Sequence, residues 1–288
     1  MDRYVHGNPN LKNYDAISVR EDEKFRNVLV QQNKEIDFDF DYTLNPYQGC
    51  SYGCKECYVQ NIIPSPIEKK GGWGNFVEIR RRTIETLDKN REILKGKRIF
   101  VSTLSDLWMP EAVASGLTRA VLEKLVTIDF YLCVLSTRST FVLKDVDILK
   151  KMSDKIEIGI SIPTDRSDLT KLLHPRVATP AARFSVAKKL KENGLTVRIQ
   201  MAPCLPYSDQ FAKMVDESAN WLLLDYCSHQ ALPYKQILQK NGFGYCLNKQ
   251  WTESQYQHFK SILGENNVKL GEEYFAWKYF KGLEKRFS

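Results

Sequence analysis

The feature that most constrains the fold is a repeated alternation between short strand-like runs and longer segments with helical spacing. Six runs rich in β-branched and aromatic residues recur along the chain, at residues 36–44, 98–104, 130–137, 156–163, 196–203 and 221–226. Most are nearly continuous apolar runs, which is typical of strands buried on both faces by helices. A strand, a helix and a further strand repeated in this way predict parallel βα units. We therefore expect an α/β fold in the form of a partial (β/α)6 barrel.

The segment from Thr179 to Gly194 shows the helical pattern most clearly. Thr179 suits the N-cap, Pro180 the first position inside the helix, and Gly194 its end. For the whole chain we expect a polar arm or peripheral helix at residues 1–34 and the partial barrel at 35–227. Residues 228–288 are rich in aromatic side chains and are expected to form a helical C-terminal extension that caps the barrel.

The composition is that of an ordinary soluble protein, with 43% hydrophobic and 27% charged residues. No stretch approaches the ~20 apolar residues of a membrane-spanning helix, and the N-terminus lacks the pattern of a secretory signal. These features predict a cytoplasmic protein with no membrane partner. The net charge of +7 permits a polyanionic partner such as a nucleic acid.

Three of the seven cysteines, Cys50, Cys54 and Cys57, stand together in a loop after the first predicted strand. In a reducing compartment such a cluster indicates metal ligands or catalysts rather than disulfides. Closed zinc and iron–sulfur centres usually have four protein ligands, so a fourth would come from a distant residue. The candidates are Cys133, Cys204, Cys227, Cys246, His174 and His229. Alternatively, three thiolates hold three irons of a [4Fe-4S] cube and leave the fourth iron open for a chelating ligand.

Four stretches of the chain carry a resemblance to a known family. They are residues 45–61, which contain the cysteines, and residues 103–111, 136–139 and 160–206. In these stretches the sequence resembles the radical S-adenosylmethionine (SAM) superfamily, and within it the spore photoproduct lyase group and its DNA-repair-photolyase-like relatives. The resemblance covers about residues 42–206, which is nearly the whole predicted barrel.

The resemblance implies a [4Fe-4S] cluster on the three cysteines, whose unique iron is chelated by SAM. An electron, from a donor such as flavodoxin or ferredoxin, then cleaves SAM to methionine and a 5′-deoxyadenosyl radical that abstracts hydrogen from the substrate. The resemblance also implies that Tyr58 lies over the cluster or the adenosine. The residues that it assigns to cofactor binding are Ser105, Asp106, Arg138, Ser161 and Ala202.

Three positions depart from the family pattern. Glu56, just before Cys57, replaces a residue that is commonly aromatic, and a charge there can shift the potential of a cluster or face a cationic group. Thr103 stands where the lyases carry a hydrogen-donating cysteine, and a hydroxyl does not donate hydrogen atoms readily. Arg138 replaces a lysine, and its planar guanidinium grips a carboxylate differently from an ammonium.

Other residues near the predicted strand ends have both a functional and a structural interpretation. Cys204 and Cys227 are candidates for a hydrogen donor or redox relay, or are simply small buried residues, whereas Cys133 is expected in the core. His174 is expected to be an exposed loop residue.

Several arginines have the same two interpretations. Arg176 and Arg183 either bind an anion at a helix N-terminus or form surface ion pairs. The basic run at residues 80–82 is expected on a solvated helix face.

Two radical SAM functions and one outside that class follow from these observations. Repair or modification of a nucleic acid follows from the family resemblance and the positive charge. Radical modification of a small metabolite, peptide or natural-product precursor follows from Thr103 in place of the donor cysteine. A non-enzymatic iron–sulfur or zinc protein would bind metal without cleaving SAM.

Overall fold

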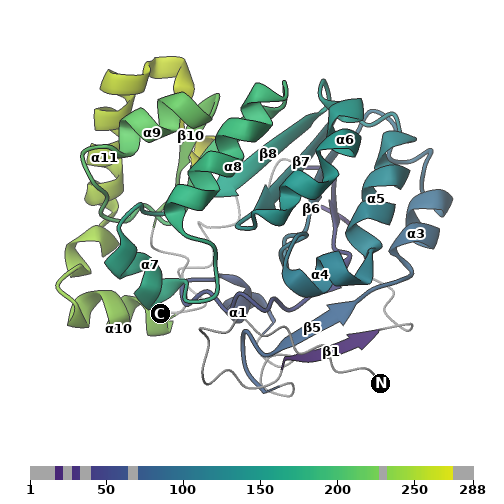
Figure 1. Cartoon of the computed structure of the whole chain (residues 1–288), viewed down its shortest axis with the longest axis horizontal. Coiled ribbons are helices and arrows are strands. Elements are labelled where there is room, and N and C mark those ends of the chain that lie inside the picture. Colours follow the sequence, from purple (N-terminus) through teal and green to yellow (C-terminus); the bar gives the residue numbers. More distant parts are fainter. Residues whose placement is uncertain (1–16, 22–27, 33–39, 64–70, 227–231, 275–288) are drawn as a thin grey trace.

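The computed structural model describes residues 17–21, 28–32, 40–63, 71–226 and 232–274 (Figure 1). Eight of the described strands form one open sheet with the strand order β11-β10-β9-β8-β7-β6-β3-β2. All neighbouring pairs in it are parallel except β2 and β3. The bounds of its strands are β2 Leu29–Gln31, β3 Tyr42–Leu44, β6 Arg98–Val101, β7 Leu132–Thr137, β8 Ile156–Ser161, β9 Thr196–Met201, β10 Trp221–Leu224 and β11 Val268–Leu270.

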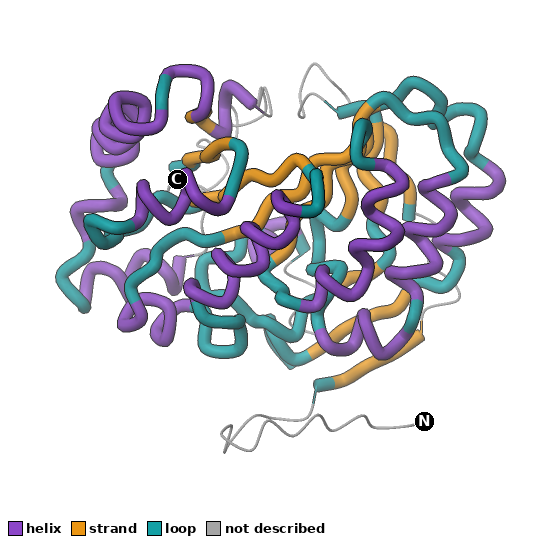
Figure 2. Tube along the Cα trace, turned by 45° about the horizontal axis from the view of Figure 1, so that its top comes forward, coloured by secondary structure: helices purple, strands orange, loops and turns teal. Residues whose placement is uncertain are grey.

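Helices fill the connections between these parallel strands, and several lie side by side on one face of the sheet (Figures 1 and 2). The helix bounds are α1 Val59–Ile62, α3 Thr83–Lys89, α4 Pro110–Ser115, α5 Leu117–Val126, α6 Val146–Leu149, α7 Ser167–Leu173, α8 Pro180–Glu192, α9 Phe211–Ser218, α10 Leu232–Lys240, α11 Lys249–Leu263 and α12 Gly271–Tyr274. Helix α8 begins as its sequence predicts, because the Thr179 side chain accepts a hydrogen bond from the Ala182 backbone. The predicted α/β partial barrel is confirmed.

The two faces of the sheet differ in chemistry because side chains alternate along each strand. Ile99 and Val101 of β6 belong to the large core under the helices. Phe100 points the other way and packs in a smaller cluster that includes Phe40. On that second face β8 and β9 also carry the buried pair Glu157 and Arg198. Among the described residues this second face is lined by aromatic and polar side chains, and helical cover of both faces stays a prediction.

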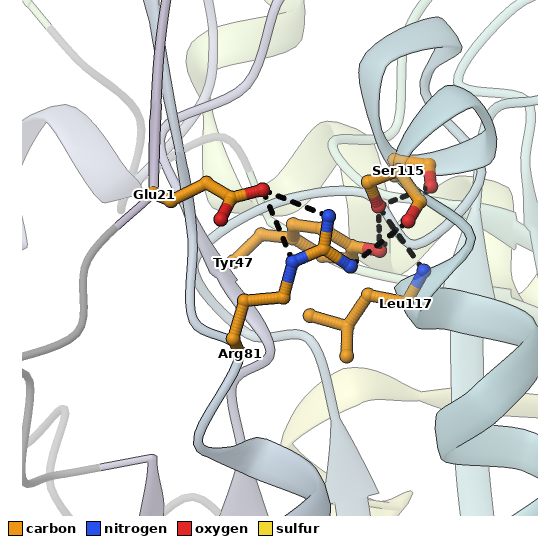
Figure 3. Close-up of polar contacts among 6 residues, drawn as sticks. Glu21, Tyr47, Arg81, Ser115 and Leu117 are labelled. Carbon is orange, nitrogen blue, oxygen red and sulfur yellow. Dashed lines mark hydrogen bonds and ion pairs between the residues drawn. The ribbon is translucent and has the colours of Figure 1, made fainter.

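A smaller sheet of β1 (Ser18–Glu21), β5 (Phe76–Ile79) and β4 (Tyr47–Gln48) adjoins the main one. Figure 3 shows Arg81 between Glu21 of this sheet and Ser115 of α4. The Arg81 guanidinium lies 2.8 Å from a Glu21 carboxylate oxygen and donates to the Ser115 carbonyl at 3.0 Å. The Tyr47 hydroxyl lies 3.2 Å from the Ser115 hydroxyl and 2.9 Å from that of Thr118. These contacts attach the cysteine-bearing loop after β4 to α4 and α5.

The ends of the chain differ in part from expectation. Within residues 1–34 the described segments form β1 and β2, not a helix. The described part of the C-terminal extension is mostly helical, as expected, but it also contributes β11, which extends the sheet beyond β10. The division into three domains stays a prediction.

Candidate active site

The cysteine loop follows β4 and is shaped by two close backbone contacts. Gly49 has a φ of +80°, and a Cβ there would lie 2.4 Å from the Phe76 carbonyl oxygen. Gly53 packs against Gly74, and a Cβ on Gly74 would lie 2.9 Å from the Gly53 Cα. Only glycine fits such approaches at positive φ. The segment around Gly74 is thus packed against the cysteine loop.

The three cysteines of this loop are free thiols that lie close enough to influence one another. Cys50 and Cys54 are buried, and Cys57 is half-buried. Burial raises the pKa of Cys54 to about 12, with the nearby Arg138 guanidinium acting against this rise. Burial also raises the pKa of Cys50, and the neighbouring Asp106, Cys54 and Cys57 add to the rise. Buried neighbouring thiols of this kind need a cation to become thiolates.

Glu56, between two of these cysteines, is 1% exposed and belongs to a buried polar network. Its Oε1 lies 2.5 Å from His174 Nε2 and 2.7 Å from an Arg138 guanidinium nitrogen. Burial alone would raise the pKa of Glu56, but His174 and Arg138 outweigh burial and hold it at about 2. Burial lowers the pKa of His174 to about 4. At neutral pH the network therefore contains a carboxylate, a guanidinium and a neutral imidazole.

His174 is therefore not the exposed loop residue that the sequence predicts. It caps the C-terminal end of α7, where its backbone N–H bonds the Thr170 carbonyl, and its ring is buried against Glu56. The sequence feature that could have indicated the burial of His174 is the Glu56 carboxylate itself. A glutamate between two candidate metal ligands in a short buried loop needs a basic partner, which can come from anywhere in the chain.

The Asp106 carboxylate holds the end of β7. It accepts bonds from the Thr137 hydroxyl at 2.7 Å, the Arg138 backbone N–H at 2.7 Å and the Trp108 backbone N–H at 2.9 Å. Burial raises the pKa of Asp106. Asp106 therefore fixes the backbone from which the Arg138 side chain extends.

Arg183 of α8 lies at the adjoining strand end. Its guanidinium is fully buried and donates to the Ser161 carbonyl at the end of β8. Ser161 is one residue beyond Ile160, which pairs with Thr137, so Arg138 and Ser161 emerge at the same level of the sheet. Burial, and then Arg138, lower the pKa of Arg183 to about 9. A surface ion pair is therefore wrong for this buried residue, and anion binding at the start of α8 stays a prediction.

Arg176 bonds two backbone carbonyls, and its predicted anion-binding or ion-pair role is not tested by these contacts. Its guanidinium donates to Gly74 at 2.6 Å and to Ser51 at 3.2 Å, and thereby joins the cysteine loop to the segment it packs on. Arg80 of the basic run is 1% exposed and donates to Asn45 and Gln48, so the predicted solvated face is wrong for this residue.

The end of β6 brings three further predicted residues together. Thr103 is held by Asn45, whose Oδ1 accepts from the Thr103 backbone at 2.9 Å and from its hydroxyl at 3.1 Å. The Tyr58 hydroxyl donates to the Thr103 carbonyl at 2.6 Å, and the Tyr58 side chain is partly exposed. The Ser105 hydroxyl lies 2.7 Å from that of Ser102. Tyr58 thus links the cysteine loop to the end of β6.

The remaining candidates follow other strands. Ala202 lies directly after β9 and is half-buried. Cys204 is fully buried, and its Sγ lies 3.9 Å from the Met201 sulfur. Both observations favour the interpretation of Cys204 as a small buried residue. Cys133 is in the core, as predicted. Cys227 and His229 lie outside the described residues.

The residues present fit a [4Fe-4S] cluster with an adjoining small anionic group. Within the described ranges, no three His, Cys, Asp or Glu side chains are arranged to hold a single metal ion. A cube instead binds each thiolate through a separate iron, so three neighbouring thiols suffice. Nitrogen atoms of both guanidinia, Nη1 of Arg138 and Nε and Nη2 of Arg183, are buried without a hydrogen-bond partner. Such donors favour an anion such as a carboxylate.

A comparison with protein families agrees with this chemistry. The model described as "Radical SAM superfamily" matches residues 44–217, which is more than half of the chain. The chain belongs to the radical SAM superfamily. It is therefore an enzyme of that superfamily, and membership implies SAM and a [4Fe-4S] cluster as cofactors. The non-enzymatic alternative is not supported.

The radical SAM relatives include two uncharacterized proteins. One, from Methanocaldococcus jannaschii, is 34% identical over 204 residues, which are 69% of this chain and 76% of that protein. Another, from Acidianus two-tailed virus, is 31% identical over 172 residues, which are 57% of this chain and 56% of that protein. The match thus spans little more than half the length of the viral relative.

Solved structures of spore photoproduct lyase share the radical SAM fold of this chain. A tyrosine-to-phenylalanine mutant has a TM-score of 0.61 at 12% identity, with 88% of this chain and 80% of the lyase covered. A double mutant with bound AdoMet and dinucleoside spore photoproduct has a TM-score of 0.55 at 15% identity, with 78% and 66% covered. At these identities the likeness concerns the fold alone. No described helix has both the length and the apolar character needed to cross a membrane.

Proposed function

We propose that this enzyme holds a [4Fe-4S] cluster on Cys50, Cys54 and Cys57, binds SAM at the adjoining strand ends, and repairs or modifies a nucleic acid. One observation carries the proposal: the loop holds three neighbouring thiols, and two of them, Cys54 and Cys57, lie near the Arg138 guanidinium, whose Nη1 has no protein partner. When bound, the cluster and SAM supply reductive cleavage of SAM and abstraction of a hydrogen atom from substrate, with an electron from a flavodoxin or ferredoxin.

The chain's own residues bind and orient these groups. The Arg138 guanidinium pairs with the SAM carboxylate through Nη1, the atom that has no protein partner. The hydroxyls of Ser105 and Ser161 would bond polar atoms of SAM, and the Ala202 backbone would contact its adenine, as the family resemblance implies. Tyr58, held by the Thr103 carbonyl, covers the cofactors and keeps water away from them.

Two observations support a nucleic acid as the substrate class. Spore photoproduct lyase structures share the fold of this chain, and one of them is described with a dinucleoside spore photoproduct bound. The chain also has a net charge of +7, which favours a polyanion. A phosphate-dominated interaction predicts that DNA or RNA stimulates SAM cleavage and that this stimulation weakens steeply as salt rises.

A second candidate is modification of a small molecule or peptide, and Thr103 favours it. The Thr103 hydroxyl is engaged by Asn45 at 3.1 Å, so this position offers no thiol as a hydrogen donor. Cys227 stays a prediction for the donor. For a small substrate we expect turnover that does not depend on nucleic acid and changes little with salt.

The deciding experiment is anaerobic reconstitution with iron and sulfide, followed by SAM and dithionite with or without DNA or RNA. We expect 5′-deoxyadenosine and methionine, and more of both with nucleic acid at low salt. Cys54→Ala should lose the iron–sulfur chromophore and all cleavage, with Cys133→Ala as the matched control that keeps both. A folded, iron-loaded protein that never produces 5′-deoxyadenosine refutes the proposal. If nucleic acid does not change the amount of 5′-deoxyadenosine, the second candidate, a small molecule or peptide, becomes the proposed substrate.

A further inference from the structure

Glu56 has no role in the functions described above, yet it is the most enclosed charged group of the cysteine loop. It is 1% exposed and stands between two cluster ligands. A buried carboxylate is costly unless it is paired, so its partners indicate what it is for. Those partners are His174 and Arg138, which come from sequence positions far from the loop and from each other.

The geometry makes Glu56 a bridge between three elements. One oxygen, Oε1, contacts both His174 Nε2 at 2.5 Å and Arg138 Nη2 at 2.7 Å. The backbone reinforces the bridge, because the Lys55 N–H bonds the Leu173 carbonyl at the end of α7 at 3.1 Å. The cysteine loop, the end of α7 and the residue after β7 are therefore held in one arrangement.

Each of the three groups in the network has one polar atom that bonds a partner and one that does not. Glu56 Oε2, Arg138 Nη1 and His174 Nδ1 are all buried and have no hydrogen-bond partner. Because Glu56 occupies Nη2, rotation of the Arg138 guanidinium about its long side chain is restricted, and Nη1 is the edge left for a ligand. His174 donates through Nε2 and holds the carboxylate in place from the opposite side.

We propose that Glu56, braced by His174, is a positioning residue that aims the open edge of Arg138 at the carboxylate of SAM. This inference rests on the function proposed above, because it takes SAM as the anion that Arg138 binds. Glu56 neither binds the cluster nor touches SAM in this role. It acts through Arg138, and the loss of its charge matters only as long as Arg138 is present.

A double-mutant cycle on SAM affinity tests this role. Glu56→Gln, Arg138→Gln and the double variant are reconstituted, their iron and sulfide contents are measured, and the Kd of SAM is determined by equilibrium dialysis without reductant. We expect about a tenfold weaker Kd for Glu56→Gln and a larger loss for Arg138→Gln. The double variant should bind no more weakly than Arg138→Gln alone.

Asp145→Asn is the matched control. Asp145 is a buried carboxylate that contacts an arginine, Arg119 at 3.1 Å, and a ring N–H, that of Trp108 at 2.8 Å, but it does not contact Arg138. Urea unfolding of the cluster-free protein should show that Glu56→Gln and Asp145→Asn both destabilise the fold. Only Glu56→Gln should change the Kd of SAM.

His174→Gln provides a second route to the same result, with a smaller loss of SAM affinity that disappears when Arg138 is Gln. Unchanged affinity in Glu56→Gln overturns the inference, and so do losses that add in the double variant. Loss of the cluster from both Glu56→Gln and His174→Gln also overturns it, since the network would then serve cluster assembly. Failure of the wild-type protein to bind SAM would instead refute the proposed function.

Discussion

Two buried arginine–carboxylate networks in this molecule have similar parts but different surroundings. In one, Glu157 of β8 pairs with Arg198 of β9, and the same Glu157 oxygen accepts from the Tyr274 hydroxyl at 2.6 Å. The Arg198 guanidinium also donates to the Ser136 hydroxyl at 3.0 Å, and the Tyr274 and Trp221 rings lie over it. In the other, Glu56, Arg138 and His174 meet at one carboxylate oxygen, and one further atom of each is buried without a partner.

The difference separates a structural network from a binding one. In the first network both charged groups contact neighbouring side chains and rings, and Gly159 leaves the space that the guanidinium occupies. The second network has donors and acceptors left over at the edge of the sheet where the cysteines lie. Buried polar groups without partners are costly, so a fold retains them where a ligand completes them. We therefore expect the first network to govern stability and the second to govern cofactor binding.

The largest expected effect comes from breaking the Glu157–Arg198 network. Arg198→Met leaves the Glu157 carboxylate buried beside apolar groups, and we expect the free energy of unfolding to fall by about 3–5 kcal/mol. Urea titration of the cluster-free protein measures this loss. The double variant Arg198→Met with Glu157→Leu should recover most of it, because apolar residues can replace a complete buried pair. A single variant as stable as wild type would mean that the pair contributes nothing to the fold.

The same contrast explains how far sequence reasoning reached. The parallel strands, the cysteine loop at their carboxyl edge and the start of α8 depend on local patterns of apolar, capping and turn residues. The burial of His174 and Arg183 does not, because it depends on partners such as Glu56 and Ser161 that are distant in sequence. Read locally, His174 precedes a proline and an arginine in a polar segment, which indicates a surface loop. Strand β11 was missed because its three residues are too short to show a period.

The network of Glu56, Arg138 and His174 predicts a smaller effect on stability, which depends on pH. His174 has an ordinary pKa of 6.5 when unfolded and a pKa of about 4 when buried against Arg138, Arg183 and Glu56. Between these values the unfolded state binds a proton that the folded state does not, so stability falls as pH is lowered from 6.5 to 4. The total loss is up to about 3 kcal/mol. His174→Gln should remove this part of the slope in urea titrations across that range, and an unchanged slope would show that the imidazole is not held neutral.

The exposed ion pair of Glu21 and Arg81 is expected to contribute least to stability among the pairs compared. The two side chains are 54% and 44% exposed, so water screens their attraction, although the contact of 2.8 Å matches those in the buried networks. Glu21→Gln should lower the free energy of unfolding by less than about 1 kcal/mol, and added salt should shrink the difference further. A loss as large as that of Arg198→Met would mean that burial does not set the strength of these pairs. The contribution of each pair would then depend on the elements that it joins, since Arg81 also joins the small sheet to α4 through Ser115.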